Sequence, residues 1–352
     1  MSASKRIFYF DALRAMAILC VVLLHVTCHL KELMNYSIVT IHSFSGAFVL
    51  FSINFFTIGV SLFLLLSGAL LLGRDSSIKD FLSKRLPRII KPFVFWSAVF
   101  TILLVAVSFI FTGVNFVSDF SIYGILKLFW DTLMCKAPGS AVYWYFWMMF
   151  GVYLIMPILN KWVKHSDLSE LEYFLALWLI SIFFDYTLMQ PCPVKLSYFT
   201  SPAGLVVLGY YLRNTDRKLF NSLSASVAVI IISTLVMFVY SYFYADSVSF
   251  SFHRYSILVV FEAIGVFCLF KNSSYMDNPN ETVRKIITSI SVCSYGIYLI
   301  HSQSIMAVRK LFHISLNFTL EYIVLFAVGF FMSWFIIYIL SKIPILKDYV
   351  GV

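Results

Sequence analysis

The sequence predicts an all-α fold, a polytopic membrane bundle of about ten transmembrane helices with both termini in the cytoplasm. Of the 352 residues, 61% are hydrophobic and only 12% are charged, whereas soluble domains carry about 25% charged residues. Apolar runs near the length that a helix needs to cross a bilayer recur along the chain. The net charge is +9, but the basic residues are scattered among short loops, which favours membrane topology over a nucleic-acid-binding patch.

The predicted spans are apolar runs bounded by polar or basic residues. They cover residues 8–30, 46–73, 92–112, 142–162, 170–190, 198–212, 220–245, 253–270, 286–308 and 319–340. The first run is long and carries charged side chains, so we take it as a span and not as a cleavable signal peptide. The sixth run is short and contains Pro202 and Gly204, so nine spans or one irregular span is the alternative. We expect one membrane domain over residues 1–352 with no fused soluble domain.

The distribution of lysine and arginine predicts the orientation. Successive loops between the predicted spans lie alternately on the two sides of the membrane. The loops on the side of the amino terminus carry 18 lysine and arginine residues, and those on the other side carry 7. Arg14, inside the first span, is the last of the 26. Cytoplasmic loops carry the excess of positive charge in membrane proteins. Both termini are therefore predicted to lie in the cytoplasm.

Three polar side chains inside the first span indicate function. Arg14 and His25 are eleven residues apart, a rotation of about 1100°, which leaves both on one helix face about 16 Å apart along the axis. Asp11 precedes Arg14 by three residues and can pair with it. Charged groups in a hydrocarbon core are costly, and those that persist usually face the protein interior and mark a functional path.

Two further polar residues are predicted to reach the depth of His25. Glu262 lies about 13 Å into the eighth span from its outer end, and His301 about 22 Å into the ninth span from its inner end. A neutral imidazole with a carboxylate to orient it is the equipment of a general base. The alternative is that both histidines are core residues bonded to carbonyls and that Glu262 pairs with one of them structurally.

The segment after the second span is rich in basic residues, among them Arg85 and Arg88 at a spacing of three. Two arginines at helical spacing can clamp phosphate bidentately, which lysine does less well. Pro87 between them suggests that a helix begins or bends there. Ordinary anchoring at the lipid headgroups is the alternative.

Aromatic residues open the fourth span, including Trp144 and Tyr145. An aromatic belt at the membrane interface explains such residues, and a platform for carbohydrate is the alternative. In the second span, Gly59, Ser67 and Gly68 predict close packing between helices.

The order of these motifs resembles the membrane-bound acyltransferase 3 family. The resemblance rests on Asp11-Ala12-Leu13-Arg14 followed by His25, on the run from Phe55 to Gly68, on Arg85-Leu86-Pro87-Arg88, on Trp144-Tyr145 through Tyr153 and Pro157, and on Ser294 through His301. It covers nearly the whole chain. The Arg-x10-His helix together with the Arg-x-x-Arg motif is the specific part, whereas the other stretches are individually weak.

The resemblance implies an integral membrane O-acyltransferase, most often an O-acetyltransferase. It would take an acyl group from cytoplasmic acetyl-CoA and place it on a hydroxyl of a cell-surface glycan or glycolipid. The expected setting is a bacterial cytoplasmic (inner) membrane, with acyl-CoA, a glycan or lipid-linked sugar and membrane lipids as partners, and with neither metal nor nucleic acid.

Roles for the residues follow from that reaction. We expect His25 to be the catalytic base, with Arg14 and Asp11 as its companions on the first helix. Arg85, Arg88 and Arg14 are candidates for binding the phosphates of CoA, whose long pantetheine arm would carry the thioester to His25. Arg14 is too far from His25 to be the oxyanion donor. The acceptor is expected at the outer end, with the following binding residues: Glu262, His301, Trp144 and Tyr145.

Two other classes of protein fit part of the pattern. A proton-coupled transporter also carries Asp, Arg, Glu and His inside its bundle, but it would move a substrate without forming a covalent product. A subunit for glycan polymerisation or export would need no CoA thioester.

The orientation is testable with reporter fusions. Fusions after Lys31 and after Lys195 should give an extracytoplasmic signal, because both positions fall in loops with few basic residues. Alkaline phosphatase and a cytoplasmically active fluorescent protein, fused in parallel, measure the two sides. A cytoplasmic signal at either position would contradict the predicted topology.

Overall fold

The computed structural model describes residues 7–33, 41–110, 116–117, 119–247, 250–312 and 317–352, and every regular element among them is a helix. In these residues, eight helical stretches are long and apolar enough to cross a membrane. They are Phe8–Leu30, Phe44–Leu71, Ile78–Ile110, Ala141–His165, Leu168–Leu188, Leu223–Tyr244, Glu281–Ala307 and Phe318–Leu340. The predicted polytopic helical bundle is confirmed.

Contacts between Cα atoms divide the chain into two compact units. Unit 1 comprises Met1–Asp75, Ile158–Ser291 and Leu316–Tyr322, and unit 2 comprises Ser76–Pro157, Val292–Ser315 and Ile323–Val352. Three helices contribute residues to both units: α6 (Trp144–His165), α11 (Glu281–Phe312) and α12 (Phe318–Leu340).

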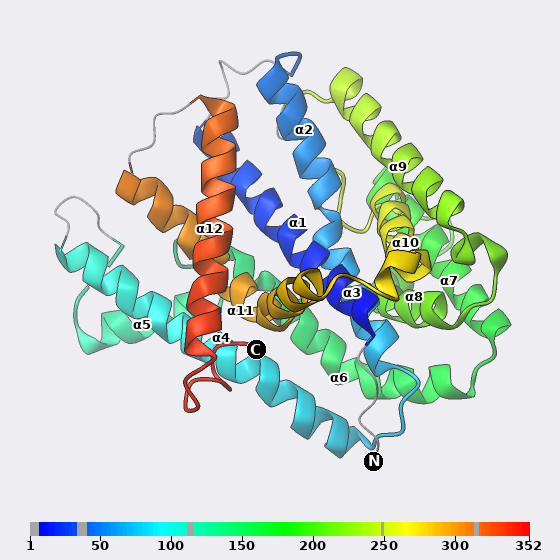
Figure 1. Ribbon diagram of the computed structural model, residues 1–352, viewed down its shortest axis with the longest axis horizontal. Coiled ribbons are helices and arrows are strands. Elements are labelled where there is room, and N and C mark those ends of the chain that lie inside the picture. The colour runs from blue at the N-terminus through cyan, green and yellow to red at the C-terminus, as the bar shows by residue number, and fades with distance from the viewer. Residues whose placement is uncertain (1–6, 34–40, 111–115, 118, 248–249, 313–316) are drawn as a thin grey trace. The chain divides into compact units, whose positions relative to one another are not determined.

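Unit 1 is built on seven further helices. They are α1 (Phe8–Leu33), α2 (Phe44–Phe56), α3 (Ile58–Leu71), α7 (Leu168–Ile182, continued by a π-helical turn Phe183–Leu188), α8 (Ala203–Asn214), α9 (Leu223–Tyr244) and α10 (Ile257–Asn272). Helix α3 packs against both α1 and α8, and α9 lies beside α10 (Figure 1). Helix α3 is therefore the central element of this unit.

The second predicted span is not one continuous helix. The structure breaks it at Thr57 into α2 and α3. The Thr57 hydroxyl donates to the carbonyl of Ile53, a bond that is known to bend helices because the side chain competes with the backbone for this acceptor.

Glycines let the backbones of unit 1 approach closely, as predicted for Gly59 and Gly68. A Cβ on Gly68 would lie 1.7 Å from the carbonyl oxygen of Val206, and one on Gly209 would lie 1.9 Å from that of Leu65. Helices α3 and α8 therefore touch through their main chains. A Cβ on Gly59 would likewise meet the α1 backbone, at 2.9 Å from the carbonyl oxygen of Ala17.

The sixth and eighth predicted spans form shorter helices. Helices α8 and α10 have 12 and 16 residues, which is about 18 and 24 Å against a hydrocarbon core of about 30 Å. The segment before α8 is irregular and is bonded to α7. Ser181 of α7 donates to the Leu196 carbonyl at 2.8 Å, and Trp178 of α7 donates to the Ser201 carbonyl at 3.2 Å. The structure thus favours an irregular sixth span.

Segments predicted to face the cytoplasm gather at one end of unit 1, which we call the inner end. Arg284 lies over the ring of Phe8 at 5.5 Å, and the Lys271 ammonium donates to the carbonyl of Leu212 at 2.7 Å. The opposite, outer end joins α2 to α9 through a 3.1 Å hydrogen bond from Asn54 to Ser241. These contacts agree with the predicted pairing of loops, while the side that each end faces stays a prediction.

Unit 2 contains α4 (Ile78–Ile110) and α5 (Ile122–Leu133) together with parts of α6, α11 and α12. Helix α4 corrects the expectation that the basic segment before residue 92 is a loop and that a helix begins at Pro87, while the alternative of a bend at Pro87 stays a prediction. The helix starts at Ile78 and continues through Pro87 and Pro92. Its amino end is capped by Ser77, whose hydroxyl accepts from the amide of Asp80 at 3.1 Å.

The close contact between α3 and α8 should not tolerate a methyl group. We expect Gly68→Ala and Gly209→Ala each to lower the free energy of unfolding of the purified protein by about 1–3 kcal/mol, because the added Cβ would overlap a carbonyl and force the helices apart. This loss would appear as a lower melting temperature. The matched control is Gly151→Ala in α6, where a Cβ would meet nothing within 4 Å. Equal melting temperatures for all three variants would contradict the close packing.

Candidate active site

Asp11 and Arg14 share one partner on α11. The Ser291 hydroxyl donates to the Asp11 carboxylate at 2.7 Å and accepts from the Arg14 guanidinium at 3.4 Å. Asp11 is buried and Arg14 is half-buried. A single hydroxyl therefore links the predicted ion pair of α1 to the amino-terminal part of α11, and sequence spacing within α1 could not reveal this partner.

His25 is oriented by its own helix. Its Nδ1 lies 2.8 Å from the carbonyl oxygen of Val21. Because a carbonyl can only accept, Nδ1 must carry the proton, and the neutral ring then has its lone pair on Nε2. The sequence suggested a carboxylate for this orienting role, and the structure gives it to a main-chain carbonyl. The role of His25 as a base stays a prediction.

The contacts of α1 with α10 locate Glu262 along the bundle. The rings of Tyr9 and Phe267 meet at 6.4 Å, edge to face, at the inner end. Glu262 is five residues from this contact, about 7.5 Å along α10, whereas His25 is sixteen residues from it, about 24 Å along α1. Glu262 also interacts electrostatically with Cys20, five residues before His25, and its convergence with His25 stays a prediction.

Glu262 instead faces α9. Its Oε1 accepts a 2.7 Å hydrogen bond from the Thr234 hydroxyl, and its Oε2 is buried without a hydrogen-bond partner. Such a group is costly when ionised in an apolar interior. Its hydrogen bond therefore joins α10 to α9.

Arg254, which the sequence did not single out, lies within electrostatic range of His25. It lies three residues before α10 and is half-buried. His25 interacts electrostatically with both Arg254 and His29. The sequence gave no signal for this role, because Arg254 counted only as a basic residue of an outer loop.

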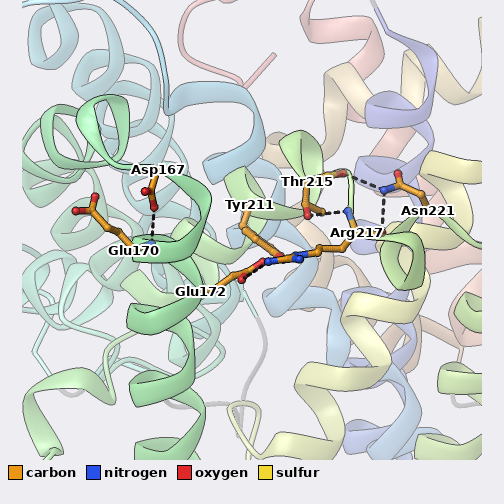
Figure 2. A network of polar contacts seen from close by, with 7 residues as sticks. All are labelled: Asp167, Glu170, Glu172, Tyr211, Thr215, Arg217 and Asn221. Atoms are coloured by element: carbon orange, nitrogen blue, oxygen red, sulfur yellow. Dashed lines mark hydrogen bonds and ion pairs between the residues drawn. The ribbon is translucent and has the colours of Figure 1, made fainter.

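The inner end of unit 1 carries a polar network, shown in Figure 2. Arg217 grips Glu172 with two hydrogen bonds, from Nε to Oε1 at 2.8 Å and from Nη2 to Oε2 at 2.9 Å, and the Tyr211 hydroxyl donates to Glu172 Oε1 at 2.6 Å. These bonds raise the pKa of Arg217. The network joins α7 to the loop after α8.

A cleft of about 390 Å³ adjoins this network, a size within the range of small-molecule sites. Glu172 and Tyr211 line one end, and the walls come from α7, α9 and α10. Leu175, Val229 and Ile264 are typical of these walls. None of the residues predicted for catalysis or binding lines the cleft.

In unit 2, His301 is fully buried among aromatic rings. Its Nδ1 donates to the Tyr298 carbonyl at 2.7 Å, so this ring has the same tautomer as His25 when neutral. The Tyr298 ring lies 5.0 Å from that of Tyr145 and 6.1 Å from that of His301. Trp144 follows at 6.0 Å from Tyr145. Three of the four predicted acceptor-binding residues thus lie in one aromatic cluster.

That cluster is a packed interior more than an exposed platform. Tyr145 and Tyr298 are buried, and the Tyr298 hydroxyl donates to the Val142 carbonyl. Trp144 is only partly buried. The faces of the two tyrosines are thus covered by other side chains, whereas a carbohydrate platform presents exposed rings.

Arg85 and Arg88 share a face near the start of α4. A spacing of three residues separates them by about 60° around the helix, with Arg88 exposed and Arg85 partly buried. The Tyr295 hydroxyl of α11 donates to the Ile89 carbonyl at 2.9 Å, which holds the next residue of α4. The two guanidinium groups are therefore carried on a helix fixed within unit 2.

The predicted site residues divide between the units. Unit 1 carries Asp11, Arg14, His25 and Glu262, and unit 2 carries Arg85, Arg88, Trp144, Tyr145 and His301. The meeting of His25 with His301, and of CoA phosphates with the arginines of α4, stays a prediction. No cluster of metal-ligating side chains occurs within the described residues.

Comparison with known proteins gives one match. Residues 7–341 match the model of a protein family described as acyltransferase domain, the acyltransferase 3 family. No curated protein and no solved structure matches the chain.

Proposed function

The chain belongs to the acyltransferase 3 family and is a multi-pass membrane acyltransferase, and we propose that it moves an acetyl group from cytoplasmic acetyl-CoA to a hydroxyl of a glycan or lipid-linked sugar. We propose that it acts in a bacterial cytoplasmic (inner) membrane and that the acceptor meets the protein at the outer side. Family membership favours covalent transfer over the transporter and export alternatives.

The hydrogen bond between His25 and Val21 is the observation that carries this proposal. It leaves the lone pair of the neutral imidazole on Nε2, which is the form that can take the proton of an acceptor hydroxyl. A base held near its target typically accelerates proton transfer by 10²–10⁴-fold. The carbonyl of Val21 also stabilises the imidazolium that forms, because its oxygen accepts the positively polarised Nδ1–H.

The distance between Arg14 and His25 along α1 separates binding of the donor from proton transfer. Arg14 lies about 16 Å from His25 along the helix axis and is bonded to Ser291 near the inner end. We assign it to the phosphates or the passage of CoA, together with Arg85 and Arg88. His25 then acts where the extended pantetheine arm delivers the thioester.

Loss of the imidazole should remove transfer and spare donor binding. We expect His25→Ala to reduce turnover by about 10²–10⁴-fold with CoA affinity nearly unchanged, since a general base acts on the transition state more than on the bound cofactor. Turnover in inverted membrane vesicles supplied with radiolabelled acetyl-CoA, and CoA binding to the purified variant, measure the two effects.

His301→Ala is the matched control for His25→Ala, and melting temperature checks that both variants fold. His301→Ala should cost less if that ring only shapes the acceptor site. Near-normal turnover in His25→Ala would refute its role as base. Complete loss in His301→Ala alone would transfer that role to His301.

The two arginines of α4 give a separate prediction. If they clamp phosphate, Arg85→Lys and Arg88→Lys should each weaken CoA binding about tenfold although the charge is kept, because lysine lacks the planar fork. Calorimetric titration with CoA measures this. Lys84→Arg on the same helix is the control, since Lys84 pairs with Asp80 at 2.7 Å. Wild-type affinity in both lysine variants would place the phosphates elsewhere.

A further inference from the structure

The proposed reaction needs a group that the first helix does not supply. Acyl transfer builds negative charge on the carbonyl oxygen of the thioester, and stabilising that oxyanion is usually the largest catalytic contribution. Arg14, the cation of α1, is about 16 Å from His25 along the axis. The oxyanion donor must therefore come from another element near His25.

Arg254 lies toward the outer end of unit 1, as His25 does. From the contact between Tyr9 and Phe267, α10 rises ten residues, about 15 Å, to its first residue Ile257. The three residues before Ile257 form a turn, closed by a 2.7 Å hydrogen bond from the Ser256 amide to the His253 carbonyl, and Arg254 lies in this turn. His25 lies about 24 Å along α1 from the same contact, and the two side chains interact electrostatically.

The backbone of Arg254 is tied to the helix that supports His25. Its carbonyl accepts a 3.2 Å hydrogen bond from the hydroxyl of Ser61 in α3. Two residues earlier in α3, Gly59 packs on α1, where a Cβ would lie 2.9 Å from Val21 Cγ2. Val21 is the residue whose carbonyl orients the imidazole. The base and the arginine are thus both positioned by one turn of α3.

Contacts of the two residues before Arg254 hold this segment in place. The Phe252 amide donates to the side-chain carbonyl of Asn54 at 2.8 Å. The His253 ring stacks on that of Tyr186 with centroids 4.2 Å apart and planes 7° apart. A catalytic charge is effective when it is positioned before the oxyanion develops, and these contacts position the backbone that carries Arg254.

From this arrangement we propose that Arg254 is a catalytic residue of the acyl transfer, binding the oxyanion of the tetrahedral intermediate beside His25. The proposal rests on the proposed function, since it presupposes a thioester donor and His25 as base. The proposal adds Arg254, from the segment before α10, to the site. The sequence had predicted the base His25 and the cation Arg14 on the same helix, α1.

The chemical step balances with these two residues. The acceptor hydroxyl gives its proton to His25 Nε2, and its oxygen bonds to the thioester carbonyl carbon while the carbonyl π electrons move to the oxygen held by Arg254. Collapse of the intermediate restores the carbonyl and breaks the carbon–sulfur bond. The thiolate of CoA then takes the proton from the His25 imidazolium, which leaves an ester, free CoA thiol and neutral His25.

The test uses two acetyl-CoA analogues, so that no acceptor is required. In one, an amide replaces the thioester and the carbonyl stays planar; in the other, an anionic methylphosphonyl group replaces the acetyl group and mimics the tetrahedral intermediate. A site built for the transition state binds the tetrahedral analogue more tightly. Calorimetry on the purified full-length protein measures both affinities.

Arg254→Gln should weaken binding of the methylphosphonyl analogue by about 10²–10³-fold, the usual effect of removing one oxyanion donor, and should leave the amide analogue unchanged. Arg254→Lys should fall between this variant and the wild type. The control Lys195→Gln removes one positive charge from an exposed position of a loop on the same predicted side and should change neither affinity. The amide analogue also verifies that each variant is folded.

Several results would overturn the proposal. If Arg254→Gln binds the methylphosphonyl analogue as tightly as the wild type, Arg254 does not hold the oxyanion. This conclusion stands even if the variant is slower in vesicles, since Arg254 could instead bind an anionic group of the acceptor. If the wild type shows no preference for that analogue, the oxyanion site is absent. If the wild-type protein binds neither analogue, the proposed CoA-dependent function is refuted. This outcome is distinct from failure of the Arg254 assignment alone.

Rescue with guanidinium supplies a second measurement. Arg254→Ala in inverted vesicles should lose about 10²–10³-fold in transfer, and added guanidinium ion should restore part of it, whereas His25→Ala should not respond. Absence of rescue together with unchanged binding of the methylphosphonyl analogue would overturn the assignment.

Discussion

The main-chain contact of α3 with α1 and α8 is the constraint on which the rest of unit 1 depends. Gly68 and Gly209 bring α3 and α8 to backbone contact, and Gly59 seats α3 on the turn of α1 that ends at Val21. In a bilayer the hydrophobic effect does not drive helices together, so close packing at small residues carries much of the association. This contact sets the position of α1 relative to α3, and through Ser61 it sets the segment before α10.

Polar groups inside unit 1 are satisfied mostly by partners one helix turn away or on the adjacent helix. His25 uses the carbonyl of Val21, and Asp11 uses the hydroxyl of Ser291. Such local pairing is expected in a membrane, because the hydrocarbon core cannot hydrogen-bond to a polar group that lacks a protein partner. Glu262 departs from the rule, with one carboxyl oxygen bonded to Thr234 and the other buried without a partner.

The sequence predicted what depends on one helix and missed what depends on the register between helices. Asp11, Arg14 and His25 could be placed on one face because the rotation per residue is the same in every helix. The depth of Glu262 was counted from an assumed span boundary at residue 253, whereas α10 begins at Ile257 and its register against α1 depends on packing such as that of Tyr9 on Phe267. Pro87 was taken to start or bend a helix, and the helix begins nine residues earlier, so that this proline lies inside it.

Arg254 was overlooked for a related reason. In a count of basic residues it is one of several in the outer loops, and its role depends on a hydrogen bond from Ser61, 193 residues away in the sequence. Helical periodicity says nothing about such a contact. The backbone tie matters for function because an arginine fixed through its main chain keeps its side chain within a limited radius of the imidazole. A flexible loop cation would have to be ordered in each catalytic cycle, at a cost in conformational entropy, and would stabilise the oxyanion less.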